Sequence, residues 1–205
     1  MFWNSQGNLL VGGSGLSVLD ENLTLLRSTA DTNIGKVLSV NELSNPEDAA
    51  WKSKYVVLRN QNLSFYSSSL NFEKTLKTFE TNRMRRTTTP LTFSLCTVDP
   101  HNHQIIAVDE AYYSNFRFVG YGGQLLFTKD LGYHGANGVY ALPDGTLLGS
   151  FSRSVVKFST NRKNLTEIWS CEINTEAKGM CTDAAGFIYV AGSTDKCISI
   201  LSPEG

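Results

Sequence analysis

The sequence predicts an all-β protein, a β-propeller of about five four-stranded blades in a single domain. Residues 138–158 and 179–201 share one pattern, in which an apolar strand, a turn containing Gly, a second apolar strand, a short loop and a third strand follow in order. Short strands that recur at a period of about 40–50 residues are typical of propellers, in which each repeat forms one small sheet. No long stretch shows a helical period, which supports the all-β class.

The second strand of each unit sets the period. These strands begin at Leu9, Val56, Ile105, Leu147 and Ile188, so the unit repeats about every 45 residues, close to the length of a four-stranded blade. The third strands follow in register, and several alternate apolar and polar residues, as strands with two unlike faces do. The expected blades are residues 1–34, 35–82, 90–132, 136–174 and 177–205.

Each expected blade places its other strands at similar distances from that second strand. First strands are expected at residues 37–40, 91–98, 139–142 and 180–182, with Phe2-Trp3 as the candidate in the first blade. Third strands are expected at 16–19, 63–66, 116–119, 155–158 and 198–201. Fourth strands are expected at 24–26, 75–79, 124–127 and 167–169. Because the fifth blade shows no fourth strand, we expect an incompletely closed propeller or a part of a six-bladed one.

Composition and charge restrict the function. The chain is 41% hydrophobic and 18% charged with a net charge of -1, so no overall field steers it toward nucleic acid or an anionic membrane. No apolar run approaches the roughly 20 residues that span a bilayer, and the N-terminus lacks the pattern of a secretory signal. The four cysteines form no Cys-x-x-Cys pair and no zinc-finger spacing. We expect a cytoplasmic protein with reduced thiols, no membrane contact, no metal and no cofactor.

The last unit resembles an NHL repeat. That repeat reads as a Gly-Ile-x-Val-Asp strand, a Gly turn, an Ile-Tyr-Val-Ala strand, a polar loop, a hydrophobic strand and Pro-Asp-Gly. The matching residues are Gly179, Met180, Asp183, Gly186, Ile188, Tyr189, Val190, Ala191, Ser193, Ile198, Ile200, Pro203 and Gly205. Residues 138–160 resemble the repeat less closely and residues 1–100 only weakly. Glu204 replaces the usual Asp, and Lys196-Cys197-Ile198 replaces the tripeptide that names the family.

The unit is similar to the propellers at the C-terminal end of tripartite-motif-type (TRIM) proteins. This resemblance implies a non-catalytic binding or scaffold module that recognises a protein or peptide, as the substrate-recognition part of a ubiquitin ligase. The sequence contains no set of Cys and His ligands that could fold a RING finger, so ligase chemistry is not expected within it. Some NHL propellers bind single-stranded RNA through basic and aromatic residues, and RNA binding is kept as an alternative.

The candidate binding residues come from one end of the propeller. If the strands run outward in order, loops between second and third strands share a face with the connections between blades, and loops of this kind carry ligand contacts. The candidate residues are Arg59, Arg83, Arg85, Arg86, Tyr112, Tyr113, Tyr133, His134, Arg153 and Lys178. The basic cluster at 81–86 suits phosphates or an acidic peptide, because guanidinium groups bind both through paired hydrogen bonds. The alternative interpretation is a solvated loop that keeps this edge soluble.

Catalytic patterns fit this sequence poorly, and we expect no catalytic or metal-binding residues. Two histidines at His101 and His103 lack a firm third ligand. Six-bladed propellers include calcium-dependent lactonases, whose metal lies on the axis among carboxylate and amide oxygens, and this enzyme class is the second alternative. The available carboxylates, Asp99, Asp144 and Asp183, are instead expected in turns at the opposite end of the first strand.

Overall fold

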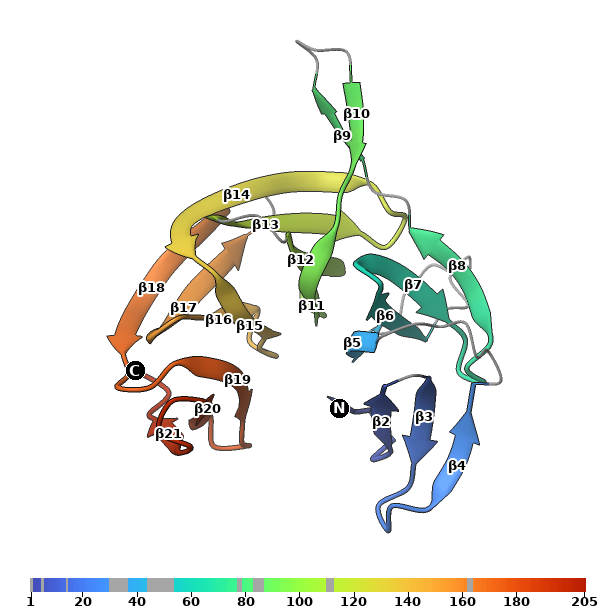
Figure 1. Ribbon diagram of the computed structural model, residues 1–205, viewed down its shortest axis with the longest axis horizontal. Helices are drawn as coiled ribbons and strands as arrows, with labels where there is room; N and C mark the ends of the chain where they lie inside the picture. The colour runs from blue at the N-terminus through green and yellow to red at the C-terminus, as the bar shows by residue number, and fades with distance from the viewer. Residues whose placement is uncertain are drawn as a thin grey trace.

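The computed structural model describes residues 2–4, 6–13, 15–29, 37–43, 54–76, 79–82, 87–109, 113–161 and 164–205. Within these ranges every regular element is a β-strand, and five antiparallel sheets are arranged as the blades of a propeller (Figure 1). The predicted all-β propeller is confirmed. The described part of the chain contains no helix long and apolar enough to cross a membrane.

Each blade is one sheet whose strands pair in sequence order from the axis outward. Blade 1 contains β1 (Phe2–Trp3), β2 (Leu9–Gly12), β3 (Leu16–Leu19) and β4 (Leu25–Ser28). Blade 2 contains β5 (Val37–Glu42), β6 (Tyr55–Arg59), β7 (Asn62–Tyr66) and β8 (Phe72–Leu76). Blade 3 contains β11 (Phe93–Asp99), β12 (Gln104–Asp109), β13 (Tyr113–Gly120) and β14 (Leu125–His134).

The last two blades follow the same order. Blade 4 contains β15 (Ala136–Ala141), β16 (Thr146–Phe151), β17 (Ser154–Asn161) and β18 (Asn164–Glu172). Blade 5 contains β19 (Ala177–Thr182), β20 (Ile188–Gly192) and β21 (Ile198–Leu201), and β21 is its outermost described strand.

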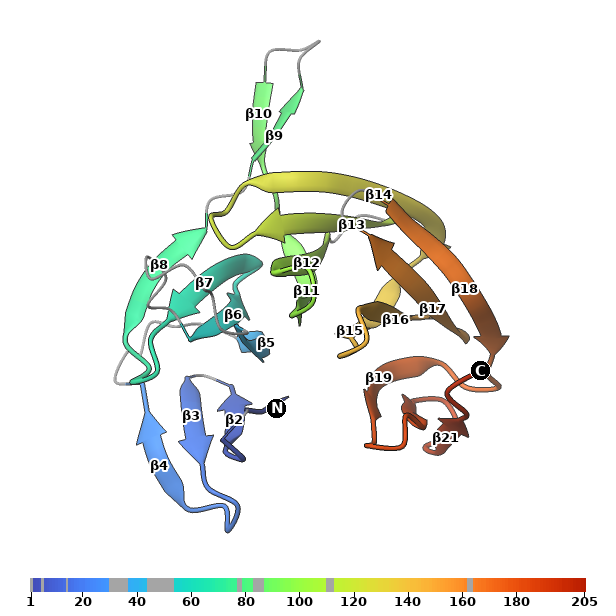
Figure 2. The same cartoon turned by 180° about the vertical axis from the view of Figure 1, so that it is seen from behind.

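The blades follow one another along an arc around a common axis. Contacts run in serial order, from β2 to β5, from β5 to β11, from β11 to β15 and from β15 to β19. Figure 1 shows an opening in the ring between blade 5 and blade 1, and the view from behind in Figure 2 shows the same opening.

Apolar side chains between neighbouring sheets form the core. Phe65 of blade 2 and Ile105 of blade 3 belong to one buried cluster, and Phe118 of blade 3 and Phe158 of blade 4 belong to the next. The strand β12 is buried along its whole length, because neighbouring blades cover both faces of blade 3. Burying one such side chain contributes roughly 1.5–3 kcal/mol, so blade stacking is the main source of folding free energy.

Three turns between first and second strands share one hydrogen-bonding pattern. Asp99, Asp144 and Asp183 each accept hydrogen bonds from backbone N–H groups of their own turn through a carboxylate oxygen. Gly145 and Gly186 follow in the last two of these turns with φ of +81° and +86°, a conformation that a Cβ atom disfavours. These hydrogen bonds confirm the turn positions predicted for the three aspartates.

The connection between blades 2 and 3 contains an element that the sequence period did not predict. β9 (Phe79–Asn82) and β10 (Thr87–Pro90) pair with each other as a two-stranded ribbon that projects away from the ring (Figures 1 and 2). The expected fourth strand at 75–79 is instead β8, which ends at Leu76. Threonine favours extended backbone, and the run of threonines in β10 is the local signal for this ribbon.

Candidate functional site: a cleft on the loop face

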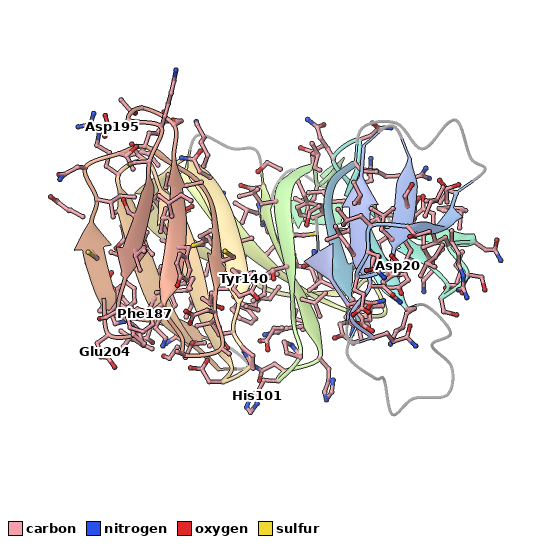
Figure 3. All side chains as sticks on the ribbon, turned by 90° about the horizontal axis from the view of Figure 1, so that it is seen from below. Asp20, His101, Tyr140, Phe187, Asp195 and Glu204 are labelled. Atoms are coloured by element: carbon pink, nitrogen blue, oxygen red, sulfur yellow. The ribbon has the colours of Figure 1, made fainter. Side chains whose placement is uncertain are left out.

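We call the end of the propeller that carries the second-to-third-strand turns and the blade connections the loop face. Three repeated backbone hydrogen bonds tie a turn of one blade to the first strand of the next. They run from Val37 N–H to the Gly13 carbonyl (3.1 Å), from Phe93 N–H to Gln61 (3.0 Å) and from Ala177 N–H to Ser152 (2.8 Å). Figure 3 shows Asp195 at this end and His101, Phe187 and Glu204 at the opposite end. The loop face is therefore held by the same rigid strands that form the core.

A cleft of about 460 Å³ lies on the loop face where blades 3 and 4 meet. It is lined by Tyr133, His134, Phe151, Ser152, Arg153, Ser154, Glu172, Ile173 and Asn174. Tyr133 and His134 end β14 of blade 3, and Arg153 lies in the turn between β16 and β17 of blade 4. The structure thus brings together three of the ten candidate residues that the sequence indicated.

One wall of the cleft is aromatic and apolar. The ring of Tyr133 stacks on Phe151 with centroids 4.5 Å apart and planes inclined by 24°. Phe151 and Ile173 are buried, so only part of this wall is open to solvent. The Tyr133 hydroxyl donates a hydrogen bond to Glu167 on β18 at 2.7 Å. Burial of the hydroxyl and the neighbouring Glu167 raise the pKa of Tyr133 to about 12, so the phenol is neutral at physiological pH.

The rim of the cleft carries charges of both signs. Arg153, His134 and Glu172 are all exposed. Beyond the rim, Lys178 lies 2.8 Å from Glu176. Hydrogen bonds from Lys178 and Ser193 lower the pKa of Glu176, and the charge of Arg153 lowers it further. Lys178 is therefore paired with a carboxylate, whereas Arg153 acts on that carboxylate only through its charge.

The remaining candidate residues are placed elsewhere or fall outside the described part. Arg59 donates a hydrogen bond from Nε to Ser64 at 3.0 Å, and its guanidinium lies 5.0 Å from the centroid of the Phe72 ring, within its own blade. The backbone of Tyr113 pairs with His134, which brings this strand end beside the cleft. Four candidates lie outside the described residues: Arg83, Arg85, Arg86 and Tyr112. The first three connect β9 to β10 in the sequence.

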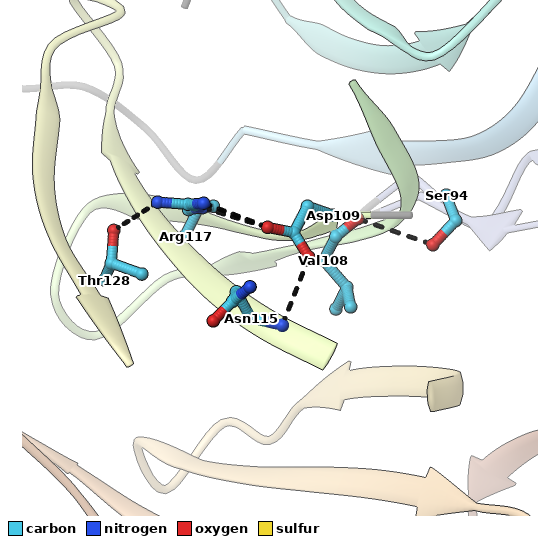
Figure 4. A network of polar contacts seen from close by, with 6 residues as sticks. All are labelled: Ser94, Val108, Asp109, Asn115, Arg117 and Thr128. Carbon is cyan, nitrogen blue, oxygen red and sulfur yellow. Dashed lines mark hydrogen bonds and ion pairs between the residues drawn. The ribbon is translucent and has the colours of Figure 1, made fainter. Parts of the chain in front are cut away.

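A buried ion pair in blade 3 supports the loop-face end of this sheet (Figure 4). Asp109 accepts hydrogen bonds from Arg117 Nε at 3.2 Å and Nη2 at 3.0 Å, and from the N–H of Asn115. Arg117 also donates to Thr128 at 2.9 Å. Because both charges are buried and fully engaged, this pair joins β12, β13 and β14 and is not presented to a ligand.

Carboxylates near the axis are occupied by their own turns. Asp99 accepts hydrogen bonds from the backbone N–H of His101, from Asn102 and from Gln104 Nε2. In the part of the chain that the structure describes, no group of three or more His, Cys, Asp or Glu side chains could hold a metal ion.

Several lining residues were not among the sequence candidates. Phe151, Glu172 and Ile173 line the cleft beside Arg153, and each lies within two residues of a strand end. The periodic pattern marks Phe151 and Ile173 as core, because it registers hydrophobicity and not the end of the sheet at which a side chain lies. For Phe151 the sequence offers one signal, its position two residues before Arg153.

Comparisons with known proteins found relatives only at the level of structure. No protein-family profile and no curated protein matches the chain. The crystal structure of the WD40 β-propeller domain of Doa1 is similar, with a TM-score of 0.68 and 16% identity over 96% of this chain and 61% of that one. A protein of unknown function from Bacteroides caccae is also similar, with a TM-score of 0.61 and 12% identity over 97% of this chain and 69% of that one.

These similarities establish the fold and nothing finer. The described residues form a β-propeller of five blades, and the similar Doa1 structure shares this fold. It spans about three fifths of the length of the Doa1 propeller structure. The NHL resemblance of the last unit remains a prediction, because no family match supports it.

Proposed function

We propose that this chain is a non-catalytic binding module that holds a segment of a partner protein in the loop-face cleft. The observation that carries the proposal is the cleft itself, in which the stacked Tyr133 and Phe151 rings lie beside the exposed Arg153 and His134. An aromatic wall with a few charged groups at its rim is the usual composition of a ligand cleft. The rigid sheets behind it would limit the entropy lost on binding.

The chemistry of the cleft favours an extended peptide with one apolar and one acidic side chain. The apolar side chain would pack against Tyr133, and the carboxylate would pair with Arg153, whose planar guanidinium suits two parallel hydrogen bonds. Glu172, which also lines the cleft, disfavours a second acidic group and a polyanion. This charge pattern, with a net charge of -1 for the chain, supports a peptide over single-stranded RNA.

The finer assignment rests on the NHL-like last unit. On this proposal the propeller recognises substrate for a tripartite-motif-type ubiquitin ligase in the cytoplasm. RNA binding and a calcium-dependent lactonase activity are the alternatives. The lactonase is the weaker one, because Asp99, Asp144 and Asp183 bond to their own turns.

Peptide selection would test the cleft directly. Peptides selected from a random library would be titrated against the protein by calorimetry. We expect Arg153→Ala to weaken binding of the selected peptide about ten- to a hundredfold, the effect of losing a charge-assisted hydrogen bond of about 1.5–3 kcal/mol. Arg27→Ala is the matched control, because Arg27 is exposed on β4 of blade 1 and donates to the Ser68 carbonyl at 2.9 Å. Equal losses in the two variants, or tighter binding of a uridine oligonucleotide than of any peptide, would refute the proposal.

Calcium titration would test the non-catalytic part of the proposal. We expect millimolar calcium to leave the melting temperature unchanged relative to magnesium, because the turn carboxylates are already hydrogen-bonded. A calcium-specific rise in melting temperature, together with lactone hydrolysis, would favour the enzyme alternative.

A further inference from the structure

Blade 5 turns one apolar sheet face toward the opening of the ring. The register aligns Cys181 with Tyr189 and Tyr189 with Ile200 in one row across the sheet, and Ala191 with Ile198 in the next. Ile198 and Ile200 are 67% and 60% exposed. The other face of the same sheet, with Ile188 and Val190, is buried against blade 4. We call the open side of the sheet the trailing face of blade 5.

The trailing face of every earlier blade is covered. In blade 4 it carries Tyr140, Leu148 and Val155, on the first, second and third strands. Leu148 and Val155 are completely buried, because blade 5 packs against them. The same stacking joins blades 1 and 2, 2 and 3, and 3 and 4. The trailing face of blade 5 therefore has the construction of an interface that recurs four times in this molecule.

Blade 1 presents the complementary surface on the other side of the opening. Leu10 and Val18 point toward blade 2, so Leu9, Leu19 and Leu25, which the register places in one row, lie on the opposite face. Leu25 is 57% exposed, Leu19 is half-buried and Leu9 is buried. Two aliphatic sheet faces thus border the same opening in the ring (Figure 1). Exposed apolar surface of this kind marks an interaction site.

We propose that the trailing face of blade 5 binds a sixth propeller blade, an antiparallel sheet that turns an aliphatic face toward Ile198 and Ile200. This surface repeats the sheet face that binds the next blade at four places along the arc, so a further blade is the occupant that fits it. A whole second copy stacked in the same sense does not fit, since the opening in Figure 1 occupies less of the ring than the five blades do. The occupant is therefore a shorter sheet.

The outer edge of blade 5 is a second reason to expect a sixth blade at this face. β21 pairs only with β20 among the described strands, whereas the third strands of the other blades each pair with a fourth. Its four residues, Ile198–Leu201, carry no charge. Proteins commonly protect free edges with charged residues or proline, and an uncharged edge is suited to pairing. A strand that completes blade 5 would lead directly into the next sheet.

Point variants test whether this face is an interface. The isolated chain should bind the dye ANS and should show a weight-average mass that rises with concentration in sedimentation equilibrium. Ile198→Lys/Ile200→Lys should abolish both signals. Ile168→Lys/Leu126→Lys is the matched control, because these residues are 51% and 46% exposed on the outer strands β18 and β14. A monomer without ANS binding, or equal effects of the two double variants, would overturn the proposal. A discrete dimer that hides the face would assign it to a second copy instead.

An extended chain tests whether the occupant is a blade. A second copy of residues 164–205, added after Gly205, would supply a fourth strand and one further three-stranded sheet. We expect the melting temperature to rise by about 5 °C or more as the trailing face is covered. The matched control carries Ile188→Lys and Val190→Lys in the added copy, on the face that packs against the preceding blade. Equal melting temperatures in the two extended chains would refute a sixth blade, whatever the outcome of peptide binding at the cleft.

Discussion

Blades 3 and 5 are built from similar strands but differ in burial. All six residues of β12 in blade 3 are buried, whereas β20 in blade 5 is buried on one face and half-exposed or exposed on the other. Both strands are apolar in sequence, with Ile-Ile-Ala-Val in one and Ile-Tyr-Val-Ala in the other. The difference arises because blade 3 has a neighbour on each side and blade 5 has one. The stability of a blade thus depends on its neighbours more than on its own sequence, as in other repeat proteins.

The largest expected difference between blades 3 and 5 is in the reactivity of their cysteines. Cys96 in blade 3 is buried, and burial raises its pKa to about 12 against the opposing hydrogen bonds from Ser39 and Asn41. Cys181 and Cys197 in blade 5 are exposed. We expect a thiol reagent at pH 8 to modify the two exposed cysteines at least about a thousandfold faster, because Cys96 reacts only after global unfolding. Mass spectrometry of peptides during labelling would measure the rates, and fast labelling of Cys96 would contradict the burial of blade 3.

A large-to-small substitution should give the next largest difference, measured as the free energy of unfolding lost in blade 3 and in blade 5. Phe118 in blade 3 is fully buried and stacks on Phe127 with centroids 3.9 Å apart. Phe118→Ala should lower the free energy of unfolding by about 4 kcal/mol through lost transfer energy and a residual cavity. Ile200→Ala should change it by less than about 0.5 kcal/mol, because Ile200 is 60% exposed. Urea denaturation of both variants gives the comparison, and similar losses would show that Ile200 is covered in solution.

The ion pairs of the two blades should differ in the same direction. Arg117→Met leaves the carboxylate of Asp109 buried without its partner and should cost about 3 kcal/mol. Asp109→Leu/Arg117→Met removes both charges and should recover most of that loss. Lys178→Met breaks the exposed pair with Glu176 and should leave the urea midpoint nearly unchanged. If the double variant is as unstable as Arg117→Met, lost packing and not the stranded charge is the cause.

The sequence predicted the repeat but not its departures from regularity. Strand periodicity located the second strands of all five blades because a half-buried or buried strand must be apolar at regular positions. Periodicity did not predict the β9–β10 ribbon, since β10 is rich in threonine rather than in large apolar residues. Exposure of Ile198 and Ile200 could not be predicted either, because a pattern of apolar residues does not reveal whether a neighbour covers them.

The cleft shows a similar division between what the sequence determines and what it leaves open. The turn that carries Arg153 and the strand end at His134 could be assigned to one face from strand order alone. That both border one cleft depends on the angle and distance between blades 3 and 4, which the Phe116, Phe151 and Phe158 rings determine by packing between the sheets. Such packing distances are set by tertiary contacts that a single sequence does not display.

The smallest expected effect is the pH dependence of stability that arises from two tyrosines. The pKa of Tyr133, near the blade 3–blade 4 junction, is raised to about 12 by burial and then by Glu167, whereas the pKa of the more exposed Tyr189 in blade 5 is raised mainly by its hydrogen bond to Asp183. The folded protein holds the Tyr133 proton more tightly than the unfolded chain, whose tyrosines titrate near pH 10. The contribution of Tyr133 is therefore complete below about pH 10 and declines as the pH rises toward about 12.

The difference in stability between the wild type and a Tyr→Phe variant isolates the contribution of that tyrosine from the contributions of other titrating groups. Cys96 also has a raised pKa and weakens the fold over the same alkaline range, but it does so equally in the wild type and in a tyrosine variant. The difference in urea midpoint between the wild type and Tyr133→Phe should shrink between pH 10 and pH 12, and the same difference for Tyr189→Phe should change less. A constant difference for Tyr133→Phe would mean that its hydroxyl is solvated and the Glu167 hydrogen bond is absent in solution. The wall of the cleft would then be more open than its stacked rings imply.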